Sequence, residues 1–131
     1  ACPAEWMVVA LDEAPGLTVE GDTDVSGSTT PICRRDDPAP VAVFSFTAPE
    51  GGDWVFETST GAEFEELDTL LELRTHCAFG SPNDILCDDD GGPGRFSQAR
   101  WRAQAGDTVY LIVGGFARAS GAFTLRAFLS E

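Results

Sequence analysis

The chain has 131 residues, of which 43% are apolar. This content, which includes nine Phe and three Trp, is enough to form one hydrophobic core. Its 22 acidic residues outnumber its eight basic residues and give a net charge of -14, which makes nucleic acid a poor partner because phosphate binding needs a basic face. No apolar stretch approaches the roughly 20 residues of a membrane span, so we expect no membrane insertion.

The first 39 residues show strand patterns that are less regular than those of the rest of the chain. The composition of Trp6–Leu11 and of Leu17–Glu20 predicts two strands. Residues 21–31 are polar and rich in Thr, Ser and Asp, and they predict a loop. No helical period extends over more than a turn or two of sequence.

Apolar and polar residues alternate clearly from residue 41 onward. In residues 41–48 one face holds Ala42, Phe44, Phe46 and Ala48, and the other holds Val43, Ser45 and Thr47, which predicts a half-buried strand. Turn-forming residues at 49–53 separate it from a second alternating segment that begins at Trp54, so we expect these two strands to form a hairpin. Residues 67–73 alternate in the same way and predict a third strand.

The C-terminal part continues this pattern. A short strand is expected at 85–87, a turn at 88–94 and a further strand at 99–103. The unbroken apolar run at 108–113 predicts a central strand covered on both faces, and 123–127 predicts the last strand. Short strands with turns every ~8–12 residues predict an all-β fold, an antiparallel β-sandwich. We expect one domain over 1–131, with its regular core in 40–131 and its N-terminal strands and loop in 1–39.

Four cysteines are too few and too widely spaced for a paired CxxC metal site, and they favour disulfides. Cys77 and Cys87 bracket a short polar segment that two adjacent strand ends could bring to bonding distance, which leaves Cys2 to pair with Cys33. Two disulfides indicate an oxidising compartment, so we expect a secreted or cell-surface protein. The alternative is four free thiols in a cytosolic protein.

The sequence holds few candidates for catalysis or for sugar binding. Nucleophilic catalysis needs a base beside its nucleophile, and the one histidine, His76, adjoins a cysteine that we expect to be bonded, so we expect no enzyme. Neighbouring carboxylates could in principle cleave a glycosidic bond, but any acidic chain contains such pairs. Trp54 and Trp101 are in phase with the buried faces of their strands, which leaves Trp6 as the candidate surface aromatic.

One acidic segment has the chemistry of a calcium site. Asp88, Asp89 and Asp90 precede two glycines, and carboxylate oxygens on a bend are ligands that Ca²⁺ prefers. Asp68, at the start of a neighbouring strand, could reach the same end of the sandwich. The alternative is a solvated turn whose Asp side chains cap backbone amides, and the residues by themselves favour that alternative.

Several short motifs occur in a familiar order from about residue 40 to the end. They are VFSFTAP at 43–49, DTLLELR at 68–74 leading to Cys77, LCDDD at 86–90, AGDTVYLIVGG at 105–115 and SGAFTL at 120–125. Their order and spacing resemble the bacterial pre-peptidase C-terminal domain, in its cysteine-bearing secreted form, over roughly two thirds of the chain.

The resemblance implies a jelly-roll-like sandwich appended to exported proteins, a domain that is not catalytic and that serves in secretion, localisation and the binding of substrate or matrix. Some relatives use calcium, so the resemblance favours Asp68, Asp88, Asp89 and Asp90 as ligands. We therefore expect a calcium-assisted adhesion or binding module, whose partner is an extracellular protein, a polysaccharide or another copy of the chain.

An assembly function is the alternative. In that case the chain is a structural subunit of a cell-surface filament, and its N-terminal strand completes the sheet of a neighbour. The residues of that strand would be Trp6, Val8 and Ala10.

Overall fold

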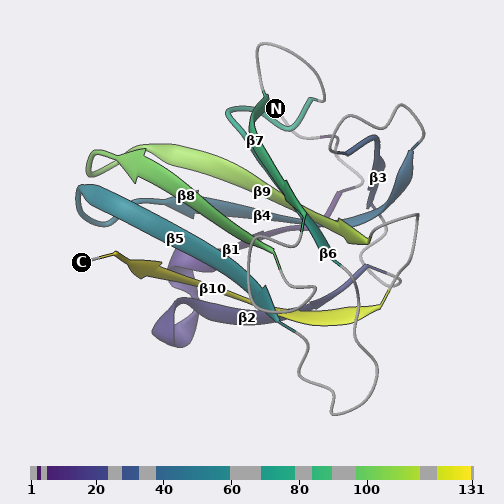
Figure 1. Cartoon of the computed structure of the whole chain (residues 1–131), viewed down its shortest axis with the longest axis horizontal. Coiled ribbons are helices and arrows are strands. Elements are labelled where there is room, and N and C mark those ends of the chain that lie inside the picture. Colours follow the sequence, from purple (N-terminus) through teal and green to yellow (C-terminus); the bar gives the residue numbers. More distant parts are fainter. Residues whose placement is uncertain are drawn as a thin grey trace.

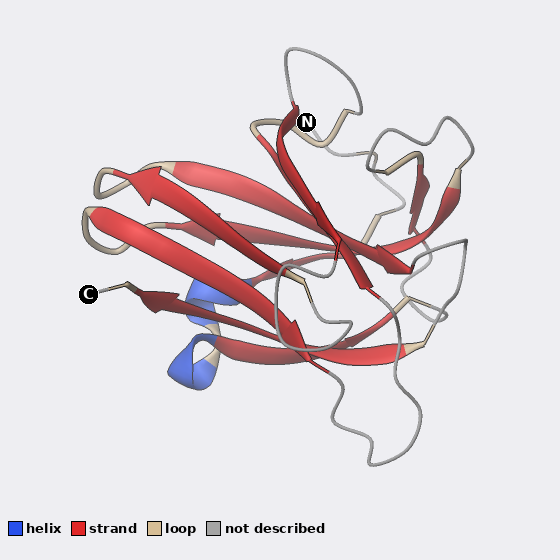
Figure 2. Ribbon diagram, viewed as in Figure 1, coloured by secondary structure: helices blue, strands red, loops and turns tan. Residues whose placement is uncertain are grey.

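Ten strands and two short 3-10 helices make up the part of the chain that the structure describes. The structure is a computed structural model and describes residues 3, 6–23, 28–32, 38–59, 69–78, 84–89, 97–115 and 121–130. Its elements are, in chain order (Figures 1 and 2), β1 (Val8–Ala10), η1 (Leu11–Glu13), η2 (Pro15–Leu17), β2 (Thr18–Asp22), β3 (Ser28–Thr30), β4 (Ala39–Thr47), β5 (Gly52–Ser59), β6 (Thr69–Arg74), β7 (Asp84–Asp89), β8 (Gln98–Ala103), β9 (Thr108–Gly115) and β10 (Ala122–Leu129). No helix in these ranges is long and apolar enough to cross a membrane.

The strands form two sheets that pack face to face. Sheet A has six strands in the order β1-β4-β9-β6-β7, with β3 paired to β4 as well, and sheet B has four in the order β2-β10-β5-β8. Every pair is antiparallel except β1 with β4, which is parallel. The prediction of an antiparallel β-sandwich is confirmed. The central, fully covered strand expected at 108–113 is β9, which lies between β4 and β6.

Aromatic rings fill the space between the two sheets. Phe46 of sheet A meets Trp54 and Phe56 of sheet B edge to face, with ring centroids 4.9 and 5.1 Å apart. Trp54 is buried and lies opposite Trp101 in the β5–β8 ladder, and Trp101 packs half-buried against the same core. The prediction that both tryptophans belong to the core is therefore confirmed. Each fully buried side chain of this size contributes about 1.5–3 kcal/mol to folding.

A second apolar cluster covers the outer face of sheet A. Its buried members alternate along the strands with residues of the main core, as opposite faces of a strand require. Residues 41–48 are therefore covered on both faces, not half-buried as predicted. The cluster consists of Ile32, Val41, Val43, Leu70, Cys77 and Ile112, with Trp6, Val8 and Tyr110 packed against it.

The expected hairpin between the strands at 41–48 and 54–60 is wrong. β4 pairs with β1, β3 and β9 in sheet A, whereas β5 pairs with β8 and β10 in sheet B. The turn at 48–51 therefore carries the chain from one sheet to the other. The same alternation and turn residues occur whether two successive strands form a hairpin or lie in different sheets. The residue pattern does not specify which strand supplies the backbone partners.

Two further expectations need correction. The segment 21–31, predicted as a loop, contains the end of β2 and all of β3, whose Ser28 and Thr30 are buried at the edge of β4. The first two residues of the turn expected at 88–94 lie in a strand instead, because β7 extends to Asp89 and pairs Asp88 with Leu71 and Asp89 with Leu70. A polar sequence can form a strand when a neighbouring strand satisfies the hydrogen bonds of its backbone N–H and C=O groups.

Candidate functional site

The outer face of sheet B presents an ordered set of polar side chains. Trp54 and Phe56 of β5 point into the core, so the residues between and beside them belong to the opposite face. Strands β10, β5 and β8 lie side by side, and their register sets these residues in rows across the face. The rows are Arg126–Glu57–Gln98 and Phe128–Val55–Arg100, followed by Ser130, Asp53 and Arg102.

Glu57 is the centre of the first row. Arg126 donates to Glu57 Oε1 from Nε at 2.9 Å and from Nη2 at 2.7 Å, while Gln98 Nε2 donates to Oε2 at 2.6 Å. The guanidinium of Arg126 also lies 4.8 Å from the ring centroid of Phe128, a cation-π distance. These contacts fix the side chain of Arg126 in one position on the face.

The other two rows carry Arg100 and Arg102. Arg102 Nη1 lies 3.2 Å from Asp53 Oδ1, and Arg100 Nη1 donates to the Ser130 hydroxyl at 3.0 Å. Val55 lies beneath them and is only 2% exposed. The surface therefore has an apolar base and a rim of guanidinium groups.

We call Arg100, Arg102, Arg126 and Phe128 the arginine face. The three arginines stand among four carboxylates on the outer face of sheet B: Asp53 and Glu57 beside them, and Glu20 and Asp22 on β2, the strand next to β10. The fourth arginine among the described residues, Arg74, is buried in another part of the fold. Basic side chains of the described surface thus gather in one place.

The sequence alone indicated part of this face. Arg100 and Arg102 alternate with Ala99 and Trp101, so an exposed polar side of that strand was expected. Arg126 joins them only because β10 and β8 both pair with β5, a tertiary arrangement that residue patterns do not specify.

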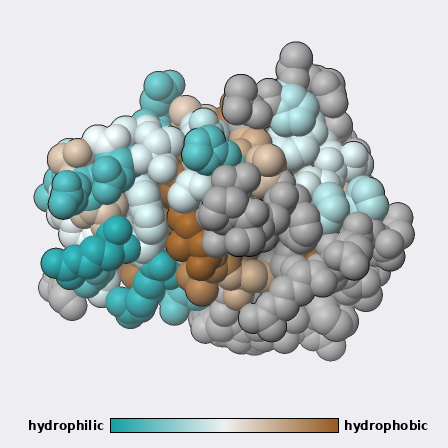
Figure 3. All heavy atoms as spheres, turned by 90° about the horizontal axis from the view of Figure 1, so that it is seen from above, coloured by the Kyte–Doolittle hydropathy of each residue, from teal (hydrophilic) through white to brown (hydrophobic). Residues whose placement is uncertain are grey.

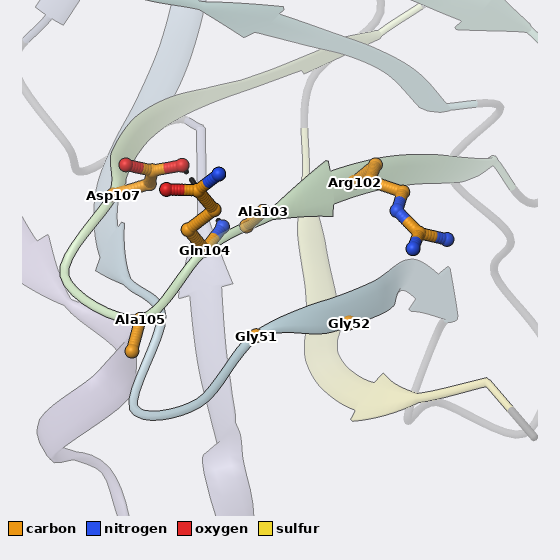
Figure 4. Close-up of a pocket in the computed structure, with 7 residues that line it drawn as sticks. All are labelled: Gly51, Gly52, Arg102, Ala103, Gln104, Ala105 and Asp107. Carbon is orange, nitrogen blue, oxygen red and sulfur yellow. Dashed lines mark hydrogen bonds between the residues drawn. The ribbon is translucent and has the colours of Figure 1, made fainter.

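A pocket of ≈ 560 Å³ opens at one end of the sandwich (Figure 4). It lies between the β4–β5 connection and the β8–β9 turn, and its lining consists of Gly51, Gly52, Arg102, Ala103, Gln104, Ala105 and Asp107. Gly52 has a φ of 149°, and a Cβ there would lie 2.9 Å from Leu129 Cδ2, so this position requires glycine.

The charged side chains of the pocket, Asp107 and Arg102, already have partners. The carboxylate of Asp107 accepts a hydrogen bond of 2.9 Å from the backbone N–H of Gln104, which closes the turn between β8 and β9. The backbone of Asp107 and Gly106 bonds in turn to Ala48. Arg102 pairs with Asp53. The pocket could accept a small polar ligand, but its carboxylate serves the turn and faces no nucleophile among the lining residues.

His76 and only two of the four residues predicted to bind calcium lie in the described part of the chain. His76 is exposed, with its Nδ1 3.1 Å from the Thr75 hydroxyl. Asp68 and Asp90 lie outside the described residues, and Asp88 and Asp89 occupy neighbouring positions of β7. No group of three metal-ligating side chains occurs among the residues that are described. Calcium binding therefore stays a prediction.

The cysteines are described only in part. Cys77 is buried and Cys87 is half-buried, and neither is a free thiol. Cys2 and Cys33 lie outside the described residues, so the predicted pairing is not tested. Cys87 lies opposite Glu72 in the β6–β7 ladder, whereas Cys77 follows β6 in a bend.

The predicted assembly strand belongs to its own sheet in this structure. Val8 and Ala10 of β1 pair with Val43 and Ser45 of β4. Trp6 is half-buried against the second apolar cluster, so it does not stand out from the surface as a platform for sugar.

Comparison with known proteins gives matches of structure but not of sequence. No protein-family model matches the chain, and no curated protein matches it. The pre-peptidase C-terminal domain of a collagenase from Bacillus anthracis is similar, with a TM-score of 0.55 and 16% identity over 98% of this chain and 99% of that one. PliG, a periplasmic inhibitor of g-type lysozyme from Aeromonas hydrophila, is similar with a TM-score of 0.53 and 13% identity over 92% of this chain and 93% of that one.

At these identities the likeness is one of fold. The resemblance to the pre-peptidase C-terminal domain, first seen in short motifs after residue 40, is confirmed at that level and extends over nearly the whole chain, strands β1 to β3 included. The chain has the sandwich fold of the pre-peptidase C-terminal domain.

Proposed function

We propose that the chain is a non-catalytic extracellular binding module and that the arginine face contacts an anionic polysaccharide. The observation that carries this proposal is the gathering of Arg100, Arg102 and Arg126 around Phe128 in a chain that is otherwise strongly acidic. An anionic polymer is repelled by most of an acidic surface, so a cluster of guanidinium groups determines where it can dock.

The chemistry of the face suits sulfate or carboxylate groups. A guanidinium donates two parallel hydrogen bonds to such a group, and this geometry makes arginine more selective than lysine for it. Arg100 is the best-placed donor, because its bond within the face goes to the neutral Ser130 hydroxyl and not to a carboxylate. Arg102 and Arg126 share their charge with Asp53 and Glu57, so they contribute less.

The extracellular location in this proposal follows from the cysteines and from the fold. Cysteines that are not free thiols favour an oxidising compartment. The similar structures come from a domain of a collagenase and from a periplasmic protein. A role without catalysis is consistent with the exposed position of His76 and with the engaged carboxylate of Asp107.

Calcium remains part of the proposal as a structural ion. Asp68, Asp88, Asp89 and Asp90 are the proposed ligands, and their oxygens match the preference of Ca²⁺. An ion bound by these residues would stabilise the fold that presents the arginine face, and in this sense binding would be assisted by calcium.

Dextran sulfate is a suitable probe because neutral dextran provides a matched control. We expect the chain to bind dextran sulfate and not dextran, with an affinity that falls as salt is added, because salt screens charge contacts at an exposed surface. Equal binding to both polymers would contradict the proposal. Equal binding to duplex DNA would show a general polyanion surface and would overturn the assignment to a polysaccharide.

A second candidate follows from the acidic charge together with the likeness to a lysozyme inhibitor. A net charge of -14 favours association with a cationic protein, and the similar structure of PliG is that of an inhibitor of g-type lysozyme. Under this alternative the chain binds a basic secreted hydrolase. Titration of the chain into a g-type lysozyme assay should then abolish cell-wall lysis near equal molar amounts, whereas unchanged activity would exclude this candidate.

A further inference from the structure

A polar pocket adjoins the arginine face at the end of strand β8. Arg102 belongs both to that face and to the lining of the ≈ 560 Å³ pocket between the β4–β5 connection and the β8–β9 turn (Figure 4). This volume lies within the range of about 300–1,000 Å³ that is typical of sites for small ligands. The described surface at this end of the sandwich, on the left in Figures 1 and 3, carries mostly hydrophilic and neutral side chains.

The outward side chains of β8 lead from the arginine face to this pocket. Gln98, Arg100 and Arg102 are alternate residues of the strand and project from one face of the sheet, at intervals of about 6.6–6.8 Å along it. Gln104 follows the strand directly and lines the pocket. A long ligand that lies along β8 can therefore contact the arginines and the pocket at the same time.

The pocket has both donors and acceptors of hydrogen bonds. The side-chain amide of Gln104 has two N–H donors and an acceptor oxygen, and it makes no hydrogen bond to another described residue. The carboxylate of Asp107 accepts one hydrogen bond, from the backbone N–H of Gln104 to Oδ2 at 2.9 Å. An ionised carboxylate has about four acceptor sites, so Asp107 can accept further bonds from a ligand.

The carboxylate of Asp107 also determines which group of a ligand fits here. A sulfate or carboxylate group has only acceptors, and its charge would be repelled by Asp107. A hydroxyl group donates and accepts, so it can bond to Asp107 and to the Gln104 amide together. Gly51, Ala103 and Ala105 add only backbone and methyl groups to the lining, and these can pack against the C–H face of a ring.

We propose that this pocket holds one sugar ring of the anionic polysaccharide through its free hydroxyl groups, while the charged groups of the polymer lie on the arginine face. The inference rests on the proposed function and adds to it a cause of specificity. The arginine face recognises negative charge, which other polyanions also carry. The pocket recognises the hydroxylated ring, which distinguishes a polysaccharide from a charged polymer without sugar.

Two polymers separate the pocket from the arginine face. Dextran of low sulfate content keeps free hydroxyls on its rings, whereas poly(vinyl alcohol) sulfated to the same charge density has hydroxyls and sulfates but no rings. Ala105→Phe narrows the pocket without a change of charge. It should lower the affinity for the sulfated dextran about tenfold, the effect of one or two neutral hydrogen bonds, and leave the affinity for the sulfated poly(vinyl alcohol) unchanged. Gln104→Ala, which removes the side-chain amide, should act in the same direction.

Thr29→Phe is the control, because it adds the same ring at an exposed position of sheet A, and it should bind both polymers like the unmodified chain. Thermal unfolding checks that each variant is folded, and Gln104→Ala, at an exposed position, keeps the test decisive if Ala105→Phe is not.

The contrary outcomes separate this inference from the proposed function. If both pocket variants bind the sulfated dextran normally while Arg100→Gln weakens the binding of both polymers, the pocket holds no sugar ring and only the present inference is wrong. Equal losses of affinity for the two polymers in the pocket variants would also contradict it, because the ring would not be what the pocket recognises. If the unmodified chain binds neither polymer, the proposed function fails and this inference fails with it.

Discussion

Arg74 and Glu72 form an ion pair inside the protein, with 2.8 Å between Arg74 Nη2 and Glu72 Oε1 and side-chain exposures of 0% and 2%. The same guanidinium donates to the backbone carbonyls of Cys77 at 2.6 Å and Pro31 at 2.7 Å. One side chain of β6 therefore connects the segment after β3, the bend after β6 and its own strand. The second apolar cluster surrounds these segments.

Removing one partner of this pair should destabilise the protein strongly. Arg74→Met removes the guanidinium from the buried carboxylate of Glu72, and we expect a loss of about 3–5 kcal/mol in the free energy of unfolding. The double variant Glu72→Leu, Arg74→Met should lose less than the sum of the two single variants. Urea unfolding measures all three, and additive losses would show that the pair is not coupled.

Asp12 is expected to hold the N-terminal strand in place. Its Oδ1 accepts a hydrogen bond of 3.1 Å from the backbone N–H of Thr47, two residues beyond the last β1–β4 pair, Ala10 with Ser45. The Asp12 carboxylate thus accepts the hydrogen bond that a backbone carbonyl would accept if the β1–β4 pairing continued. Asp12→Ala should reduce stability by about 1.5–3 kcal/mol, and Asp12→Asn by less because the amide keeps an acceptor oxygen. Equal losses of stability in the two variants would show that the hydrogen bond to the Asp12 oxygen does not stabilise the protein.

Calcium should stabilise the protein if the acidic residues bind it. A ligand that binds the native state alone adds about 2.7 kcal/mol at a hundredfold excess over its Kd. Thermal unfolding with calcium should therefore occur at a higher temperature than with chelator. The difference should disappear in Asp88→Ala and in Asp89→Ala. Identical melting in both conditions would contradict calcium binding by these residues.

Peptide mapping under non-reducing conditions tests the predicted disulfides, Cys2–Cys33 and Cys77–Cys87. The structure gives a specific competitor, because Cys77 packs in the same cluster as Ile32, the neighbour of Cys33. A peptide that links Cys33 to Cys77 would contradict the predicted connectivity, and free thiols would also remove the compartment argument. Loss of either bond by reduction should cost about 2–5 kcal/mol.

The sequence predicted the strands better than it predicted their partners. Period-two alternation located β4, β5, β6, β8 and β10, because the burial of one face of a strand determines its residue pattern, and an unbroken apolar run located β9. It failed for β3, whose polar residues are buried by the ladder, and for the connection from β4 to β5, which changes sheet. Pairing depends on contacts between distant segments, and local composition does not encode them.

The same reason limited the prediction of a binding site. Acidic residues adjacent in sequence suggested a calcium site at once, because their chemistry is visible without a fold. Arg126 and Phe128 are more than 20 residues from Arg100 in the chain, and only the β10–β5–β8 order brings them onto one face. A site whose residues come from several strands of a sheet can be predicted only when the register of those strands is known.

The most direct test of the proposed function compares two variants with the same net charge. Arg100→Gln removes a guanidinium from the arginine face, and Thr29→Glu changes the net charge equally at an exposed position of sheet A. Affinity for dextran sulfate is measured for both and for the unmodified chain. One charged hydrogen bond is worth about 1.5–3 kcal/mol, so Arg100→Gln should weaken binding about tenfold or more while Thr29→Glu binds almost normally. Equal affinities of the two variants would contradict the assignment of this face as the binding surface.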